Sequence, residues 1–168
     1  QNTLLLSDYD ELDNRTEGGN DSYLQTTIGI YATIVGSDYN HEGLYKSIDT
    51  GRTWVKEPAI GLPPSYTGGF GWYFGQIGIS PKSDDNIFLL GVNLYETKDA
   101  GATWQLSDDF SLHPDQHRIF FVNENTILVA TDGGLYKSSD GGASWEDIEN
   151  IPNTQYYRVA NNPHNDEY

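Results

Sequence analysis

Two amino acids are missing from this 168-residue chain, which has no cysteine and no methionine. The lack of cysteine excludes a disulfide framework, a thiol nucleophile and a thiolate metal site. The length corresponds to about one domain. Since there is no initiator methionine, we expect a mature product or an excised fragment.

Basic residues are scarce: Lys and Arg number 9 against 25 Asp and Glu, which gives a net charge of −16. Nucleic-acid binders neutralise phosphates with clustered Lys and Arg, so this charge argues against nucleic acid as a partner. It argues equally against an anionic membrane surface. Long apolar runs are also missing, because runs such as 87–90 are far shorter than the ~20 residues that span a bilayer. We expect no membrane insertion.

Helical periodicity is absent as well, since no apolar stripe of helical period continues beyond about two turns. The 18 glycines, together with Asn, Asp and Ser, stand between short apolar runs. This pattern is typical of short strands joined by tight turns. The aromatic content of 13% is too high for a disordered chain. The sequence therefore predicts an all-β fold.

Three segments repeat one pattern, Leu-Tyr followed by Ser/Thr-x-Asp-x-Gly-x-Thr/Ser-Trp, and they cover residues 43–54, 93–104 and 134–145. Their tryptophans are 50 and 41 residues apart, which fits four short strands per unit, as in a propeller blade. The repeated positions are Ser47, Asp49, Gly51 and Trp54, then Thr97, Asp99, Gly101 and Trp104, then Ser138, Asp140, Gly142 and Trp145.

Each repeated residue has a structural role in a hairpin turn. The aspartate carboxylate accepts N–H groups of the turn, and the hydroxyl residue before the tryptophan bonds back across it. The glycine supplies a positive φ. The tryptophan begins the next strand and is expected to bury against a neighbouring sheet. We interpret the repeated aspartates as closing turns.

The three segments resemble the Asp-box, or BNR, repeat of sialidase-like β-propellers. Segments 71–77, 91–95, 113–117, 131–136 and 154–159 add a resemblance to a secreted bacterial branch labelled "glycosyl hydrolase, BNR repeat". That branch is related to the sortilin Vps10 propeller and to xyloglucanase-type propellers. The resemblance covers roughly residues 27 to 168, and it implies a β-propeller that is secreted or displayed at the cell surface.

The strand pattern predicts four-stranded antiparallel blades near 27–57, 72–106 and 118–148, followed at 154–160 by the opening strand of a further blade. Residues 1–26 are set apart as an N-terminal strand, near 3–6, and an acidic insertion. Closed propellers have about four to eight blades. We therefore expect part of a larger propeller, whose remainder, or another chain, is the partner that covers the open faces.

Residues 7–22 hold six acidic residues and one arginine. Asp8, Asp10 and Asp13 offer hard oxygen ligands, so one interpretation is a calcium loop. The other is a solvated insertion between strands, because the segment lacks the spacing and the closing glutamate of an EF-hand. No other cofactor is expected.

Asp132 is the second residue of the segment 131–134, Thr-Asp-Gly-Gly. A similar Thr-Asp-x-Gly-Gly segment in xyloglucanase-type propellers carries a catalytic aspartate, so the resemblance implies an acid or base role, although the spacing here is one residue shorter. Glycosidases use two carboxyl groups about 5–9.5 Å apart, and we expect the second to come from another blade. The alternative is a turn residue that precedes a strand.

The segment 113–117, His-Pro-Asp-Gln-His, is the next candidate. Alternate residues of an extended segment share a face, so His113, Asp115 and His117 are expected to converge on one ligand or metal ion. The alternative is polar packing within a loop. We expect this motif and Asp132 to lie on a common face near the propeller axis.

Aromatic residues stand among glycines in 68–75. Sugars stack on exposed aromatic faces, which favours Trp72 and Tyr73 as ligand-binding residues. In the alternative, Trp72 and Phe74 alternate into the core, and we favour burial for Phe74.

Three function classes follow. The first, which we favour, is a secreted scaffold that binds a protein or a glycan. The second is part of a glycoside hydrolase acting on a β-glucan-type polysaccharide, so enzymatic activity stays open. The third is a calcium-stabilised structural module. Sialidases clamp a carboxylate with three arginines; the chain has four in all, and Arg52 lies in a repeated turn, which argues against that chemistry.

Overall fold

The computed structural model describes residues 3–5, 24–25, 29–107 and 111–151. All the regular structure in this part of the chain is β-strand, so the predicted all-β fold is confirmed. None of the described residues forms a helix that could cross a membrane.

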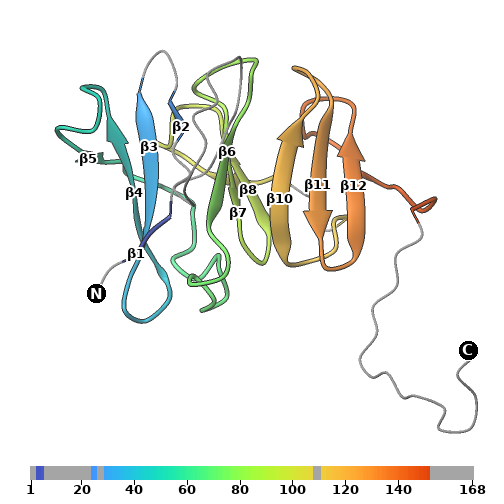
Figure 1. Cartoon of the computed structure of the whole chain (residues 1–168), viewed down its shortest axis with the longest axis horizontal. Coiled ribbons are helices and arrows are strands. Elements are labelled where there is room, and N and C mark those ends of the chain that lie inside the picture. The colour runs from blue at the N-terminus through green and yellow to red at the C-terminus, as the bar shows by residue number, and fades with distance from the viewer. Residues whose placement is uncertain (1–2, 6–23, 26–28, 108–110, 152–168) are drawn as a thin grey trace, which may run out of the picture.

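The strands form three antiparallel sheets that stand side by side along the chain, and we name them blades 1, 2 and 3 (Figure 1). Blade 1 contains β1 (Thr3–Leu5), β2 (Leu24–Gln25), β3 (Ile30–Val35), β4 (His41–Ser47) and β5 (Val55–Lys56). Blade 2 contains β6 (Gln76–Ile79), β7 (Ile87–Leu90), β8 (Leu94–Thr97) and β9 (Gln105–Leu106). Blade 3 contains β10 (Gln116–Phe121), β11 (Ile127–Thr131), β12 (Gly134–Ser138) and β13 (Glu146–Asp147).

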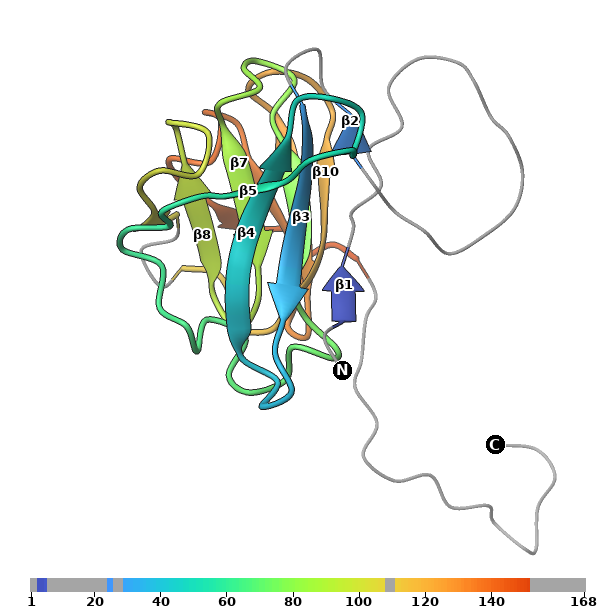
Figure 2. The ribbon, with the colours of Figure 1, turned by 90° about the vertical axis from the view of Figure 1, so that its left-hand side faces the viewer.

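The first strand of blade 1 is made of two pieces, because β1 and β2 both pair with the same edge of β3. Leu5 of β1 lies opposite Thr33, and Leu24 of β2 lies opposite Tyr31. Figure 2 shows this edge of the sheet beside β3 and β4. The proposed calcium ligands Asp8, Asp10 and Asp13 lie outside the described residues, as does the predicted strand at 154–160.

Blade 2 is packed on both faces, and all four residues of β7 are buried. Ile87 and Leu89 belong to one apolar core with blade 1 residues such as Leu44. The intervening Phe88 and Leu90 belong to a second core with blade 3 residues. Each core is thus shared between two blades, and no blade has a core of its own.

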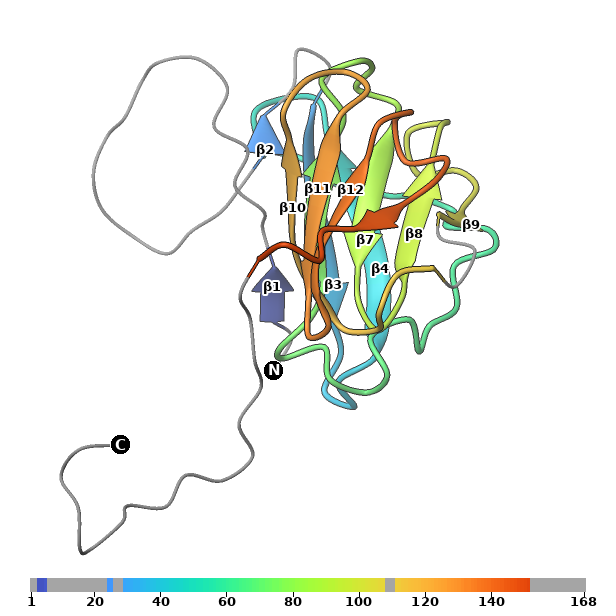
Figure 3. The same ribbon diagram turned by 90° about the vertical axis from the view of Figure 1, so that its right-hand side faces the viewer.

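The first strands of blades 2 and 3 approach closely at Gly78. A Cβ atom on Gly78 of β6 would collide with the side chain of Ile119 in β10. Glycine at this position therefore permits the contact between these two strands. Figure 3 looks onto blade 3 and shows β10, β11 and β12 side by side.

The three repeat turns, residues 47–54, 97–104 and 138–145, have nearly the same hydrogen bonds. In the second, Asp99 accepts the Thr103 N–H at 2.7 Å and the Thr103 hydroxyl at 2.6 Å, and the Thr97 hydroxyl donates to it at 2.7 Å. Asp49 and Asp140 accept the equivalent bonds. The predicted turn-closing role is confirmed, and so is the positive φ of Gly51, Gly101 and Gly142.

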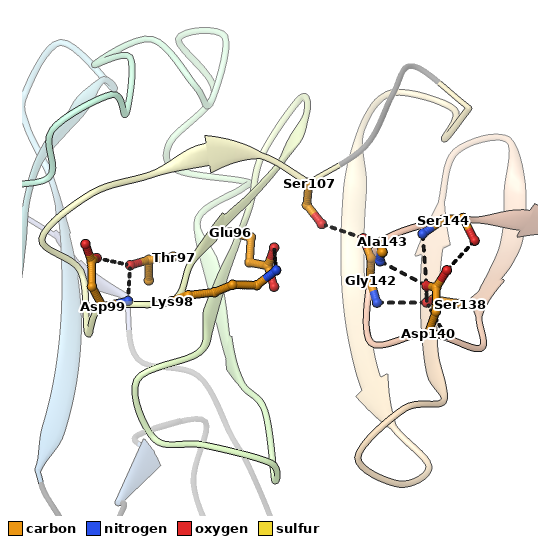
Figure 4. A network of polar contacts seen from close by, with 10 residues as sticks. All are labelled: Glu96, Thr97, Lys98, Asp99, Ser107, Ser138, Asp140, Gly142, Ala143 and Ser144. Carbon is orange, nitrogen blue, oxygen red and sulfur yellow. Dashed lines mark hydrogen bonds and ion pairs between the residues drawn. The ribbon is translucent and has the colours of Figure 1, made fainter.

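Figure 4 shows the second and third turns together with their surroundings. The Ser107 hydroxyl donates to the carbonyl of Gly142 at 3.3 Å and so links blades 2 and 3. In the same view Lys98 pairs with the buried carboxylate of Glu96 at 3.1 Å. The Ser107–Gly142 bond fastens neighbouring blades at the end of the molecule that carries the repeat turns, whereas the Lys98–Glu96 pair lies within blade 2.

The repeated tryptophans are not equally buried. Trp104 is 6% exposed and packs in the core between blades 1 and 2, and Trp145 packs against the core between blades 2 and 3. Trp54 is 38% exposed, so the prediction of burial is wrong for this residue. Trp104 and Trp145 each pack toward the preceding blade, and among the described residues no sheet precedes blade 1.

Candidate functional site

The end opposite the repeat turns is built from loops, and we call it the loop end. It is the lower end in Figure 1, toward which β11 points. It consists of the turns 36–40, 91–93 and 131–134 and of the segments 63–75 and 111–115. Hydrogen bonds join these loops across the blades: Gly71 N–H donates to the Tyr39 carbonyl at 2.9 Å, and Val92 N–H to the Tyr66 carbonyl at 3.0 Å.

His117 and Asp132 meet at the loop end. His117 lies near the start of β10 and Asp132 directly follows β11, and these ends are adjacent because the two strands are antiparallel. The Nε2 atom of His117 lies 2.5 Å from Oδ1 of Asp132. The side chains are 30% and 46% exposed, respectively. Two motifs that the sequence separates by 15 residues thus form one partly exposed polar pair.

The alternation predicted for His113, Asp115 and His117 is wrong. Asp115 has φ of 68°, in the left-handed region, so the segment is not extended there and alternate side chains do not share a face. His113 instead lies against Gly133, where a Cβ atom would collide with its ring. Among the described residues, no group of three or more His, Asp or Glu side chains could hold a metal ion.

Backbone contacts still bring the whole motif to Asp132. The Asp132 N–H donates to the Asp115 carbonyl at 3.2 Å, and the Asp115 N–H donates to the Val92 carbonyl at 2.9 Å. The loop before β10 is therefore held between the turns of blades 2 and 3. The catalytic role expected for Asp132, and the ligand-binding role expected for the 113–117 motif, stay predictions.

An aromatic shelf lies beside the His117–Asp132 pair. Tyr73 and Phe74 contact the His117 ring, at centroid distances of 5.4 and 5.7 Å. Trp72 packs on Tyr73 at 5.5 Å. Trp72 and Tyr73 are 62% and 58% exposed, whereas Phe74 is 6% exposed. We use "aromatic shelf" for Trp72 and Tyr73, and the predicted burial of Phe74 is confirmed.

The shelf is exposed because residues 72–75 are not part of a strand, contrary to the prediction that blade 2 begins near residue 72. The N–H groups of Tyr73 and Phe74 both donate to the Phe70 carbonyl at 2.8 Å, so the chain turns there and β6 begins only at Gln76. Gly71 packs so closely on Val35 and the Tyr39 carbonyl that a Cβ atom would collide with both. The loop is thereby fixed in place while its two aromatic rings project outward.

Sequence reasoning missed one polar residue of this site. Gln116, at the start of β10, is 1% exposed, and its Nε2 donates to the His113 carbonyl at 2.9 Å. Its Oε1 atom has no hydrogen-bond partner among the described residues. Gln116 shapes the loop that presents His117. Its place between two more conspicuous histidines was the only signal in the sequence.

No protein-family model and no curated protein matches the sequence. Solved structures do match in shape. One is the GH74 enzyme of Niastella koreensis, with 18% identity and a TM-score of 0.53 over 73% of this chain and 21% of that one. Another is the GH74 xyloglucanase of Xanthomonas campestris, with 18% identity and a TM-score of 0.53 over 74% of this chain and 22% of that one.

A third match is YCF48 bound to D1 peptide, with 19% identity and a TM-score of 0.49 over 69% of this chain and 36% of that one. This chain spans about a fifth of the length of the two GH74 proteins. At 18% identity the likeness to these two GH74 proteins concerns architecture. Together with the three antiparallel four- and five-stranded sheets, it shows that the chain has a β-propeller fold.

Proposed function

We propose that the loop end is a binding face for a neutral glycan, within a secreted or cell-surface propeller that acts as a scaffold. The observation that carries this proposal is the exposed aromatic shelf, Trp72 and Tyr73, held beside the His117–Asp132 pair. Aromatic faces pack against the apolar side of a sugar ring. The carboxylate and imidazole beside them offer hydrogen-bond acceptors and donors for its hydroxyl groups.

Charge decides the class of glycan. The chain carries a net charge of −16, and the polar pair beside the shelf includes the carboxylate of Asp132. Polysaccharides that carry sulfate or uronate groups would be repelled by this field. A neutral polymer such as a β-glucan meets no such penalty. The GH74 xyloglucanase among the structural neighbours supports xyloglucan as the first polymer to test.

The remainder of a propeller is the protein partner that we propose for the open faces of the arc. Phe120 in β10 and the adjacent Val122 are 61% and 52% exposed on blade 3, and Trp54 is exposed on blade 1. By strand register Phe120 corresponds to Gly78, which lies at the contact between blades 2 and 3, and Trp54 corresponds to the buried Trp104. A further blade on each side would bury them.

The test is calorimetric titration of the full chain with xyloglucan oligosaccharides. Trp72→Ala removes the most exposed ring of the shelf, and we expect affinity to fall about ten-fold, which corresponds to about 1.4 kcal/mol. Phe120→Ala is the matched control, because its ring is equally exposed but lies on blade 3 away from the shelf. Equal affinities for the two variants would reject the proposed face.

A glycoside hydrolase is the second candidate. It is favoured by the partly exposed carboxylate of Asp132. Glycosidic cleavage requires a pair of carboxyl groups, and under this alternative the second comes from another blade. Under this alternative, the full-length protein releases reducing sugar from xyloglucan, and Asp132→Asn abolishes that release while binding persists. Absence of turnover in the unmodified full-length protein would leave the scaffold function alone.

A further inference from the structure

One exposed aromatic residue of the loop end belongs neither to the aromatic shelf nor to the two apolar cores of the described residues. It is Tyr39, in the turn 36–40 between β3 and β4, and it is 53% exposed. Large side chains exposed singly are common on protein surfaces and need no explanation. Exposure alone therefore assigns Tyr39 no role, and the argument below starts from its backbone.

The backbone of Tyr39 has φ of 64°, in the left-handed region. Its N–H donates to the Gly36 carbonyl at 3.0 Å, and the Gly36 N–H donates to the Asn40 carbonyl at 2.9 Å. The hairpin therefore contains a turn that is followed by a left-handed residue, a position that glycine usually occupies. A bulky aromatic residue is unfavourable there, because its Cβ atom crowds the carbonyl oxygen that follows.

The other left-handed residues show how unusual this choice is. Thr50 and Ala100 hold one equivalent position in the first two repeat turns, where the third repeat has Gly141. Among the described residues, Tyr39 is the one aromatic residue with a positive φ. Its ring is not buried in a core that would offset the strain. Strained residues of this kind cluster at ligand sites, so the strain points to a contact outside the protein.

Tyr39 is bonded to the loop that carries the aromatic shelf. Its carbonyl accepts the Gly71 N–H at 2.9 Å and the Thr67 hydroxyl at 3.3 Å, and Gly71 directly precedes Trp72. Figures 1 and 2 show the turn between β3 and β4 and the loop before β6 side by side at the same end of the molecule. Exposed rings therefore stand on two segments whose backbones are joined.

We infer that Tyr39 is a further binding residue of the proposed glycan face, and that its ring stacks on a sugar unit farther along the polymer than the unit on Trp72 and Tyr73. This inference rests on the proposed function. The ring offers an apolar face to the sugar, and its hydroxyl donates to and accepts from sugar hydroxyl groups. The ligand is thus an oligosaccharide of several neutral units and not a single sugar.

A second aromatic contact makes affinity depend on the length of the ligand, because it forms at a high effective concentration once the first contact is made. We expect a long cello-oligosaccharide to bind about five-fold more tightly than a short one, on the scale of one aromatic contact. Tyr39→Gly should abolish this gain and leave the affinity for short oligomers unchanged. Tyr39→Phe keeps the ring and should keep the gain.

The same substitution has a second readout, which a structural role of the ring would not produce. Because glycine adopts a left-handed conformation without strain, Tyr39→Gly should raise the midpoint of thermal unfolding by about 2 °C. Thr50→Gly is the matched control, since Thr50 also has a positive φ, of 61°, and is exposed in a repeat turn at the opposite end. It should raise the midpoint similarly and leave binding unchanged.

The experiment is a calorimetric titration of the full chain and its variants with cello-oligosaccharides of two to six glucose units, together with thermal unfolding of each variant. An unchanged affinity of Tyr39→Gly for the longest oligomer overturns the inference.

An equal loss at every length also overturns it, since Tyr39 would then act by positioning the loop 63–75. A lowered unfolding midpoint of Tyr39→Gly does so too, since the ring would then be held by packing within the protein. In these three cases the proposed function survives if Trp72→Ala still weakens binding. If no oligomer binds, or if Trp72→Ala has no effect, the proposed function fails and the inference fails with it.

Discussion

Trp104 and Trp54 occupy the same position of the same repeat, yet one is buried and the other is 38% exposed. Their local contacts are alike: the indole N–H of Trp104 donates to the Gly101 carbonyl at 3.1 Å, and that of Trp54 to the Gly51 carbonyl at 3.0 Å. The difference in exposure comes from the presence or absence of a neighbouring blade. Trp104 packs on blade 1, and Trp54 has no described sheet on the equivalent side.

The comparison separates two sources of structure in the repeat. The hydrogen bonds of each turn form within one hairpin, so they are the same wherever the sequence recurs. The apolar packing forms between hairpins, so it depends on the position of a blade in the row. In a repeat protein, stability is approximately the sum of such internal and interface terms.

The largest expected effect is on stability at the two tryptophans. Trp104→Ala removes a large buried side chain, so the free energy of unfolding should fall by about 3–5 kcal/mol. Trp54→Ala should cost about 1 kcal/mol or less, as is usual for exposed positions. Urea unfolding of both variants measures the contrast, and equal losses would show that the packing against blade 1 does not stabilise Trp104.

A smaller contrast is expected between Gly101 and Gly51. Both have positive φ, of 101° and 82°, so alanine at either position should cost about 1–2 kcal/mol of backbone strain. At residue 101 the new Cβ would also lie 2.7 Å from Cδ2 of Leu44 in blade 1, whereas at residue 51 the nearest atom is 3.7 Å away. Gly101→Ala should therefore lower the free energy of unfolding by about 1 kcal/mol or more beyond the loss caused by Gly51→Ala.

Thermal or urea denaturation of the two glycine variants provides the measurement. A Gly101→Ala protein no less stable than Gly51→Ala would mean that blades 1 and 2 shift apart without cost at this contact.

The smallest expected effect concerns pH and is common to all three turns. Bonds from the Ser144 hydroxyl and N–H lower the pKa of Asp140 to about 2, and the equivalent bonds lower the pKa of Asp49 and Asp99. A carboxyl group whose pKa is lower in the folded state stabilises the fold above its unfolded pKa, about 3.9. That contribution is lost as the pH falls toward the folded pKa.

Asp140→Asn should therefore lower the unfolding midpoint at pH 7, and the gap to the wild-type protein should narrow between about pH 4 and pH 2. Asp49→Asn should behave in the same way, since the stabilisation by the carboxylate arises within one hairpin. A difference in unfolding midpoint between either variant and the wild-type protein that stays the same down to pH 2.5 would exclude the carboxylate charge as the source of stabilisation.

The features that sequence reasoning predicted correctly are those that depend on local contacts. The repeated Asp, Gly and Thr or Ser residues specify each turn by short-range hydrogen bonds, and the spacing of the tryptophans gives the blade period. The order of the blades could be predicted from the order of the repeats. The exposure of Trp54 could not be predicted, because a repeat unit contains no information on whether a neighbouring blade is present.

The candidate site was predicted in part. Asp132 and the 113–117 motif were expected on one face, and the structure brings His117 and Asp132 together through the antiparallel pairing of β10 with β11. The individual orientations were not predictable from periodicity. Asp115 adopts a left-handed conformation because the loop is bonded to Asp132 within blade 3 and to Val92 in blade 2, and neither contact can be read from the periodicity of the sequence.

The conformation of the loop at 70–75 was predicted wrongly for a related reason. Its aromatic residues alternate as in a strand, but the packing of Gly71 on Val35 and Tyr39 requires a turn.

The contact between Gly78 and Ile119 bears on the curvature of the whole row. Two blades behave as a wedge, whose angle is set by the separation of their first strands relative to that of their last. Glycine lets the first strands come together and so widens the angle from one blade to the next. A bulkier residue there would push the narrow edge of the wedge open and flatten the arc, and a ring built from such flatter steps would need more blades to close.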